Sequence, residues 1–374
     1  MTNVKTARDY RLISADSHLT EPGDLWTSRV EKKFVERVPR IVHLEKGAAW
    51  QMEGVADPVP FGHTVCAGNA PEDLRDWMHI EEMRSGGWDP KERINELDAD
   101  NVDAEVLFPN RPWRSVVANT DPDLHHAMVR AYNDWLSEYC SYAPDRLGGC
   151  AAIPSRGVKE AVAEVERTAE MEGLVAYLLS SYPHGNTTLS EDDDPVWAAI
   201  EQIGKPITIH VNLSDTMPLP LALTAAKLPG TAHFYDAPGR MLELIFGGVL
   251  DRFPGLKFVM TEVDVGWVPY FVDQADDNYL RHAKAAFRDN PLPMLPSDYI
   301  REFFYFTFIT DMYGIRNRDL IGHTHMLWSN DYPHITSDWP NSWKTVNAQF
   351  GGVPYDERHA MLAGNAVDLY KFGR

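Results

Sequence analysis

The chain has few cysteines and an excess of acidic residues. Its 374 residues include three cysteines, Cys66, Cys140 and Cys150, which are widely spaced and form no CxxC pair. This spacing argues against a disulfide framework and against a thiolate metal site. The formal charge is −20, and no lysine- and arginine-rich run occurs. We therefore expect no nucleic-acid partner, because phosphate binding requires a basic surface.

Long apolar runs and glycine-rich phosphate motifs are also absent from the sequence. No apolar run reaches the length of about 18 residues that a membrane span needs. The N-terminal MTNVKTARDYR is not followed by the apolar segment of a signal peptide. We therefore expect a cytoplasmic protein with no membrane partner. No GxGxxG sequence follows the first predicted strand, which argues against a dinucleotide-binding fold.

Apolar and aromatic residues, in contrast, are plentiful. Hydrophobic residues make up 44% of the chain, with 11 Trp, 15 Tyr and 15 Phe. A chain of this length and composition can bury a large core, and we expect one domain over residues 1–374. The many aromatic residues also favour an apolar cavity or interface.

Short buried strands recur along the chain with helical segments between them. The predicted strands cover residues 11–17, 102–108, 147–153, 174–179, 207–211, 256–262, 303–308 and 326–330. The predicted helices cover residues 91–100, 122–142, 158–172, 195–202, 240–253, 268–286 and 356–370. Eight strand–helix units close most economically into a (β/α)8 TIM barrel of the α/β class, and an open doubly wound sheet is the alternative.

Three connections are longer than ordinary loops. Residues 19–90 follow the first predicted strand and are rich in tryptophan, proline and glycine. Because long loops in a compact domain usually serve as lids or interfaces, we predict an insertion that covers the barrel mouth. Residues 213–235 and 287–301 are expected to be further mouth loops or contacts between subunits.

Acidic residues and histidines stand where several predicted strands end. Asp16 and His18 close the first strand, His210 the fifth and Glu262 the sixth, and Asp331 follows the eighth. In a TIM barrel the carboxyl ends of the strands share one mouth, so these side chains can converge. Imidazoles and carboxylates together suit a divalent metal. A single histidine at such a position is more often a packed rim residue.

Seven segments together resemble one family. They are ISADSHLTEPGDLW, NVDAEVLFPN, YNDWLSEYCSYAPDRLGGCAAIP, GKPITIHVN, RFPGLKFVMTEVDVGWVPY, LWSNDYPH and GNAVDLY. As a set they resemble the amidohydrolase-related family (amidohydrolase 2) typified by aminocarboxymuconate semialdehyde decarboxylase, within the amidohydrolase superfamily of metal-dependent TIM barrels. The resemblance implies metal ligation by Asp16, His18, His210 and Asp331, and it suggests a homodimer or homotetramer.

Two positions depart from the pattern of this family. The first strand carries Asp16-Ser17-His18 where the family often has HxH, which leaves the identity of the metal open. Glu262 follows the sixth strand, where several decarboxylases carry a histidine, and a glutamate does not reproduce the charge behaviour of a histidine. Glu262 is therefore a candidate catalytic residue that either binds the metal or contacts substrate, and its identity weighs against decarboxylation.

These residues favour a metal-dependent hydrolase. One divalent ion, with zinc ahead of manganese or iron, would activate a water molecule near neutral pH, and Asp331 would act as ligand and base. The substrate would be a small aromatic or carboxylated molecule with an amide, ester or C–C bond. The alternative is a metal-dependent non-oxidative decarboxylase or lyase of an aromatic or related acid. A third hypothesis is a binding protein that has lost catalysis.

Four further residues are candidates for the site. His334 lies in the predicted mouth loop, where it either acts in catalysis or is simply solvated. Arg111 and Arg114 follow the second predicted strand and can clamp a substrate carboxylate, although exposed arginines often only form pairs at a rim. Trp267 stands at the start of a predicted helix, as a substrate contact or a packing residue.

Overall fold

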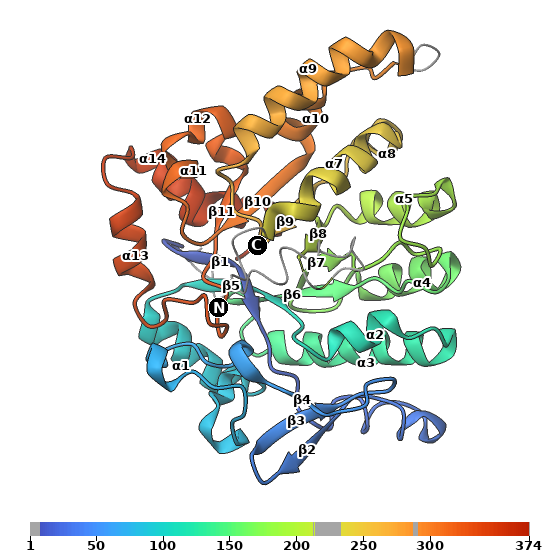
Figure 1. Cartoon of the computed structure of the whole chain (residues 1–374), viewed down its shortest axis with the longest axis vertical. Coiled ribbons are helices and arrows are strands. Elements are labelled where there is room, and N and C mark those ends of the chain that lie inside the picture. The colour runs from blue at the N-terminus through green and yellow to red at the C-terminus, as the bar shows by residue number, and fades with distance from the viewer. Residues whose placement is uncertain (1–7, 212, 214–232, 287–290, 374) are drawn as a thin grey trace, which may run out of the picture.

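The chain folds around a sheet of eight parallel strands. The computed structural model describes residues 8–211, 213, 233–286 and 291–373 (Figure 1). The strands follow one another around the sheet in chain order: β1 (Ile13–His18), β5 (Ala104–Phe108), β6 (Leu147–Ala152), β7 (Leu174–Leu178), β8 (Ile207–His210), β9 (Phe258–Thr261), β10 (Phe304–Phe308) and β11 (Met326–Trp328). They are almost entirely buried because helices cover the outer face of the sheet. The predicted TIM barrel is confirmed.

The first and last strands meet at a seam that is bonded but irregular. The backbone amide of Asp331 donates to the carbonyl of Asp16 over 3.0 Å, and that of His18 donates to Tyr332 over 2.6 Å. The register of β1 against β5 shifts between Ser14 and Ser17. These contacts join β1 to the chain just after β11, and they nearly close the barrel.

Helices surround the barrel, generally one or more after each strand. The main ones are α1 (Pro90–Asp100), α2 (Trp113–Ala118), α3 (Pro122–Cys140), α4 (Val158–Thr168), α5 (Asp194–Ile203), α7 (Ala237–Phe246), α8 (Val249–Arg252), α9 (Val268–Ala286), α10 (Pro296–Phe303), α11 (Met312–Arg316), α12 (Arg318–Ile321), α13 (Ser342–Gln349), α14 (Tyr355–His359) and α15 (Asn365–Tyr370). Short 3-10 turns cover residues 32–34, 62–64, 71–73, 80–82, 85–87, 191–193, 233–236 and 323–325. None of the described helices combines the length and apolarity that a membrane crossing needs.

Two of the long helices begin with the same local signal. Asp89 accepts hydrogen bonds from the amides of Lys91 and Glu92, and Asp121 accepts one from Leu124. A proline follows each aspartate at the first helical position, where its missing N–H leaves no helical bond unmade. The Asp-Pro dipeptides therefore set where α1 and α3 start.

Several predicted boundaries are wrong. The expected helix 240–253 is two helices, because Gly248, with a positive φ of 68°, interrupts the helix between α7 and α8. The expected loop 287–301 contains the start of α10, while its residues 287–290 lie outside the described residues. The expected loop 213–235 falls largely on residues 214–232, which also lie outside them. The predicted helix 356–370, in contrast, is helical throughout, with a π-helical turn over Ala360–Gly364 between α14 and α15.

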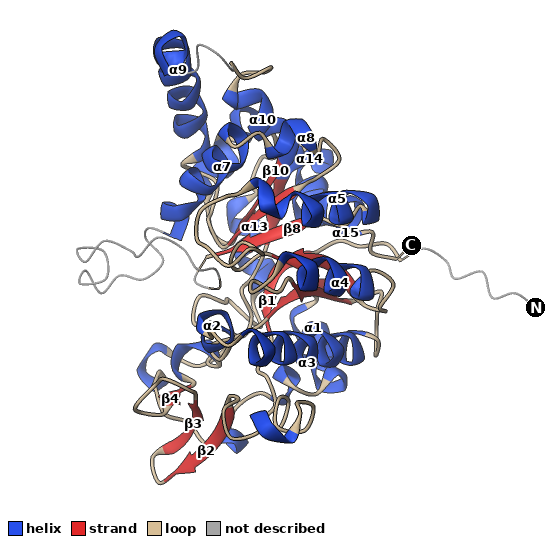
Figure 2. Cartoon of the chain, turned by 90° about the vertical axis from the view of Figure 1, so that its right-hand side faces the viewer, coloured by secondary structure: helices blue, strands red, loops and turns tan. Residues whose placement is uncertain are grey.

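Residues 19–90 contain a second, smaller sheet. Its antiparallel strands are β2 (Arg40–Leu44), β3 (Gly47–Gln51) and β4 (Val59–Pro60). Figure 2 shows this sheet and helix α9 at opposite ends of the molecule. Trp26, Trp50 and Phe61 of this segment pack on one another and join the same hydrophobic core as the barrel. Large aromatic burial of this kind holds the insertion against the barrel.

Candidate metal centre

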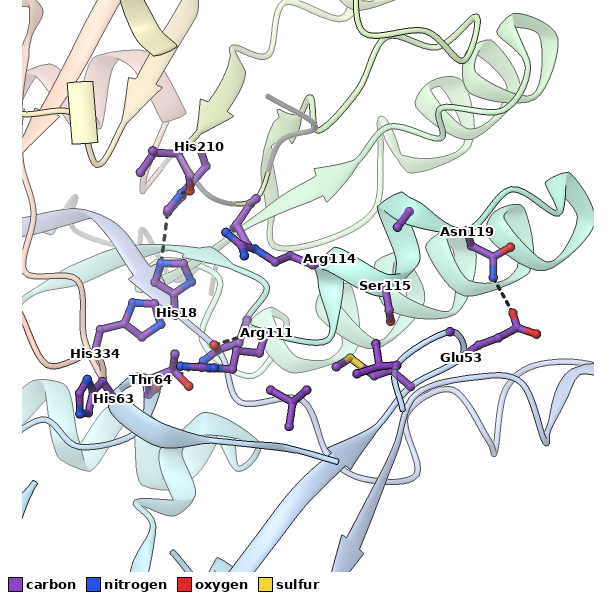
Figure 3. A pocket seen from close by; sticks show the side chains of 18 of the residues that line it. His18, Glu53, His63, Thr64, Arg111, Arg114, Ser115, Asn119, His210 and His334 are labelled. Carbon is purple, nitrogen blue, oxygen red and sulfur yellow. Dashed lines mark hydrogen bonds between the residues drawn. The ribbon is translucent and has the colours of Figure 1, made fainter. Parts of the chain in front are cut away.

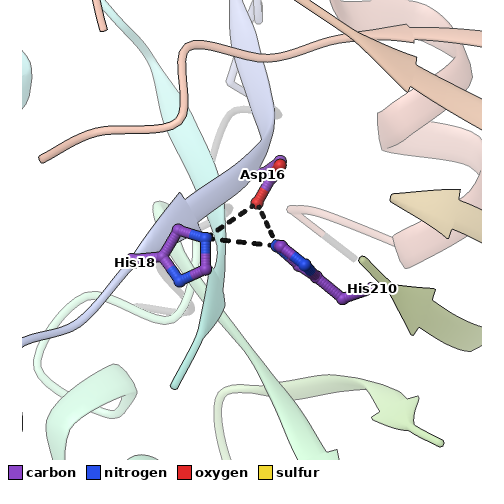
Figure 4. Close-up of side chains that lie close together, drawn as sticks. All are labelled: Asp16, His18 and His210. Atoms are coloured by element: carbon purple, nitrogen blue, oxygen red, sulfur yellow. Dashed lines mark hydrogen bonds and ion pairs between the residues drawn. The ribbon is translucent and has the colours of Figure 1, made fainter. Parts of the chain in front are cut away.

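Three potential ligands meet at the ends of β1 and β8. The Nε2 atom of His210 lies 3.1 Å from Oδ1 of Asp16 and 3.1 Å from Nε2 of His18 (Figure 4). The third separation, from His18 Nε2 to Asp16 Oδ1, is 3.6 Å. All three side chains are at most 1% exposed. The predicted convergence of strand-end residues is therefore present in the structure.

Backbone carbonyls orient both imidazole rings. Nδ1 of His18 lies 2.7 Å from the carbonyl of Pro109, and Nδ1 of His210 lies 2.6 Å from that of Val211. A carbonyl only accepts, so each neutral ring carries its proton on Nδ1 and turns the lone pair of Nε2 inward. Two nitrogen lone pairs and a carboxylate oxygen then face one another, an arrangement that a divalent cation satisfies.

The ionisation of these groups agrees with a cation site. Burial lowers the pKa of His18 well below its usual value, and His334 and His210 lower it further. Burial also lowers the pKa of His210, but Asp16 more than offsets this effect, so the pKa of His210 is raised. A proton on His210 would therefore compete with a bound cation, and cation binding would release it. The second oxygen of Asp16, Oδ2, has no hydrogen-bond partner among the described residues.

Asp331 and His334 lie directly beside this cluster. Oδ1 of Asp331 is 3.3 Å from Nε2 of His18 and 2.9 Å from Nδ1 of His334, although the latter contact has no hydrogen-bond direction. The His334 ring stacks on His18 with a centroid distance of 3.9 Å. The Thr336 hydroxyl donates to Oδ2 of Asp331. His18 is thus shared by two groups of possible ligands, Asp16–His18–His210 and His18–Asp331–His334.

Glu262 faces the same region from the end of β9. Its Oε2 lies 3.8 Å from Nδ1 of His210, on the side of the ring away from the lone pair that faces Asp16. Burial raises the pKa of Glu262 well above its usual value, and the nearby carboxylates of Asp331 and Asp16 raise it further. Glu262 therefore stands next to the three-residue cluster without belonging to either ligand group.

A cavity of about 1260 Å3 opens from these residues. His18, His210 and His334 lie at one end of it in Figure 3, and Arg111 and Arg114 lie nearby. Its further lining comes from residues 52–55, 59 and 63–64 of the insertion and from residues 115 and 118–121. The site can therefore bring an organic molecule directly against the candidate ligands.

The sequence profile of the family described as amidohydrolase matches residues 42–372 of this chain. This match assigns the chain to a family, and the TIM barrel and the cluster of candidate ligands agree with it. The chain belongs to the amidohydrolase family. It is an enzyme of that family, as its resemblance implies, and its described residues provide a site suited to one divalent metal.

We compare this amidohydrolase with three proteins that are similar to it in sequence or fold. It is 26% identical to a γ-resorcylate decarboxylase of Rhodococcus jostii over 312 residues, 75% of this chain and 87% of the relative. Its fold is similar to that of an amidohydrolase from Mycobacterium avium subsp. paratuberculosis (TM-score 0.77, 20% identity, 97% and 100% of the two chains). It is also similar to a dihydroxybenzoic acid decarboxylase from Polaromonas that contains manganese and an inhibitor, 2-nitroresorcinol (TM-score 0.66, 19% identity, 98% of both chains).

Of the remaining candidate site residues of this amidohydrolase, the arginines line the cavity and the tryptophan does not. Arg111 and Arg114 line the cavity, and Nε of Arg111 is buried without a hydrogen-bond partner among the described residues. Trp267 is not among the described residues that line it. Its indole N–H donates to the carbonyl of Val263, and its ring packs on Phe306, so the structure favours the packing role over the substrate contact.

Sequence reasoning missed a buried ion pair behind the ligands. Nε of Arg93 lies 2.6 Å from Oε1 of Glu105, and both side chains are fully buried. Nη1 of Arg93 also donates to the carbonyl of His18 over 3.0 Å, so the pair supports the backbone of a candidate ligand. Glu105, a charge inside the otherwise apolar strand β5, was the available signal, because such a residue requires a partner.

Proposed function

We propose that this amidohydrolase-family enzyme is a metal-dependent, non-oxidative decarboxylase of an aromatic or related carboxylic acid. The observation that carries this proposal is the position of Asp331, which lies 3.3 Å from a candidate ligand, His18, and 2.9 Å from His334, at the inner end of a cavity that Arg111 also lines. Decarboxylation needs a proton donor and a positively charged group for the substrate acid, and in this proposal Asp331 and Arg111 would supply them. The two decarboxylases among the comparisons support the same reaction.

In this proposal Asp16, His18 and His210 would hold one divalent ion, with Asp331 beside them. When bound, the ion would supply positive charge that stabilises an anionic substrate. Zinc was expected ahead of manganese or iron, but mixed nitrogen and oxygen ligands do not select among them. The manganese in the Polaromonas relative makes manganese an equal candidate here.

Asp331 would deliver the proton that replaces carbon dioxide. The C–C bond to the carboxylate breaks, its electron pair stays on the ring carbon, and a C–H bond forms with the proton of the Asp331 carboxyl group. His334, 2.9 Å away, would restore that proton.

The arginines would orient the substrate. Burial lowers the pKa of Arg111, whereas Asp76 raises it, and the guanidinium remains a cation that can bind a carboxylate or phenolate oxygen. Residues 19–90 would cover the barrel mouth, since several of them line the cavity. His334 and Glu262, which also line the cavity, would contact substrate as well. We expect a homodimer or homotetramer.

A paired assay tests this function. Enzyme purified without chelator and loaded with either zinc or manganese is given hydroxybenzoic acids in one arm and the matching phenyl esters and anilides in the other. We expect carbon dioxide and the decarboxylated phenol in equal amounts from at least one acid. Hydrolysis of the esters or anilides without carbon dioxide from any acid would instead establish the hydrolase.

A further inference from the structure

The cavity is larger than a single-ring acid requires. Its volume of about 1260 Å3 exceeds the range of about 300–1,000 Å3 that is usual for small-molecule sites. The candidate ligands occupy only its inner end. In Figure 3 the outer end, marked by Ser115, Asn119 and Glu53, lies on the far side of Arg111 and Arg114. A benzoate held at the ligands would leave this outer part without substrate.

Several apolar side chains also line this cavity. Met52, Val55 and Val59 come from the connection between β3 and β4 and its edge, and Ala118 comes from the last turn of α2. Val55 is 37% exposed although it is a large apolar side chain that lines a cavity. Apolar surface left open to water inside a cavity favours an apolar occupant.

Side-chain bonds fix the outer wall in place. Asn119 donates to Oε2 of Glu53 over 2.9 Å, and Arg37 binds both Glu53 and Asp121 at 2.7 Å. The connection between β3 and β4 is thereby tied to the start of α3. One cation faces two carboxylates in this cluster, so its net charge is negative and it disfavours an anionic group at the outer end.

We propose that the natural substrate is an aromatic acid with an uncharged apolar extension, an alkyl chain or a second ring, that lies between Val55 and Ala118. The position of the acid group rests on the proposed function, whereas the extension is inferred from the outer cavity. The cavity end beside Glu53 then sets the length of the substrate that the enzyme accepts.

The test compares a hydroxybenzoic acid with its hexyl-substituted and phenyl-substituted forms. Calorimetric binding of the corresponding phenols to metal-loaded enzyme is measured together with kcat/KM for the acids. We expect the extended phenols to bind at least about tenfold more tightly than the simple phenol. The hexyl and phenyl arms show which kind of extension the wall accepts.

Two tryptophan variants locate the effect. Val55→Trp fills the outer cavity and should remove the advantage of the extended phenols while binding of the simple phenol stays unchanged. Leu44→Trp is the matched control, because Leu44 is 38% exposed on the same small sheet and is not among the described residues that line the cavity. It should leave all affinities unchanged. If Val55→Trp does not fold, Ala118→Met adds volume to the cavity lining from α2 instead.

The outcomes separate this inference from the proposed function. Equal binding of simple and extended phenols, or equal weakening of both by Val55→Trp, would overturn the extended substrate. If no acid releases carbon dioxide but the extended phenols still bind more tightly and respond selectively to Val55→Trp, the decarboxylase assignment fails and the extended ligand stands.

Discussion

The charged groups at the two ends of the cavity differ in their exposure to water. At the inner end, Asp16, His18 and His210 are buried, and backbone carbonyls hold both imidazole rings. At the outer end, Arg37 and Glu53 form an ion pair in which both side chains are 38% exposed. Water screens the outer ion pair but not the inner cluster. Substitutions at the inner end should therefore change metal affinity and turnover strongly, whereas substitutions at the outer end should change stability only slightly.

The largest expected effect comes from removing an inner ligand. His210→Ala deletes a nitrogen that lies 3.1 Å from both Asp16 and His18, and metal affinity should fall by more than about 100-fold, with loss of turnover. Mass spectrometry of the metal content of protein purified without chelator measures this change. His282→Ala, on the exposed surface of α9, is the control and should keep its metal. Full metal occupancy in His210→Ala would rule out the proposed centre.

Asp331→Asn tests chemistry at the inner end with little change in shape. Asparagine cannot deliver a proton, so turnover should fall by about 10²–10⁴-fold while the circular dichroism spectrum and melting temperature remain close to those of the original enzyme. Asp319→Asn on exposed α12 serves as the control. An Asp331→Asn enzyme with ordinary activity would remove Asp331 from the mechanism.

Glu21→Gln should change stability by an intermediate amount that depends on pH. Burial raises its pKa from the usual 4.5 to about 7, so the folded protein holds this proton more tightly than the unfolded chain does. Stability is therefore lost as pH rises from about 4.5 to 7, by about 3 kcal/mol in total. Glu21→Gln keeps an acceptor for the Asn110 amide, which Glu21 binds over 2.8 Å, and removes this titration.

Urea unfolding at pH 5 and pH 8 measures the difference between the two proteins. Glu21→Gln should gain about 2–3 kcal/mol relative to the original protein when the pH changes from 5 to 8. Parallel stability curves for the two proteins would show that Glu21 does not titrate in this range.

The smallest effect is expected at the outer end. Glu53→Gln removes the charge that binds Arg37, and because the pair is exposed the free energy of unfolding should change by less than about 1 kcal/mol. The kcat for an unsubstituted hydroxybenzoic acid should not change. A loss of metal or of kcat in this variant would show that the two ends are not independent.

The same contrast explains what could be predicted from the sequence. The inner end was predictable because short apolar strands end in Asp16, His18 and His210, and a TIM barrel must bring strand ends together. The outer wall was not, because β2 and β4 are partly exposed and nothing local shows that Val55, in the connection between β3 and β4, faces a cavity. Trp267 was ambiguous for a related reason: its direction is set by distant Phe306 rather than by its neighbours in the chain.

The seam between β1 and the chain after β11 has a consequence for biosynthesis. Ribosomes make the candidate ligands Asp16 and His18 first, but Asp331, whose amide bonds to Asp16, emerges more than three hundred residues later. The complete candidate site can therefore form only late in synthesis. A polypeptide terminated before Asp331 would contain the sequences of all eight barrel strands and still lack the carboxyl group that lies 3.3 Å from His18.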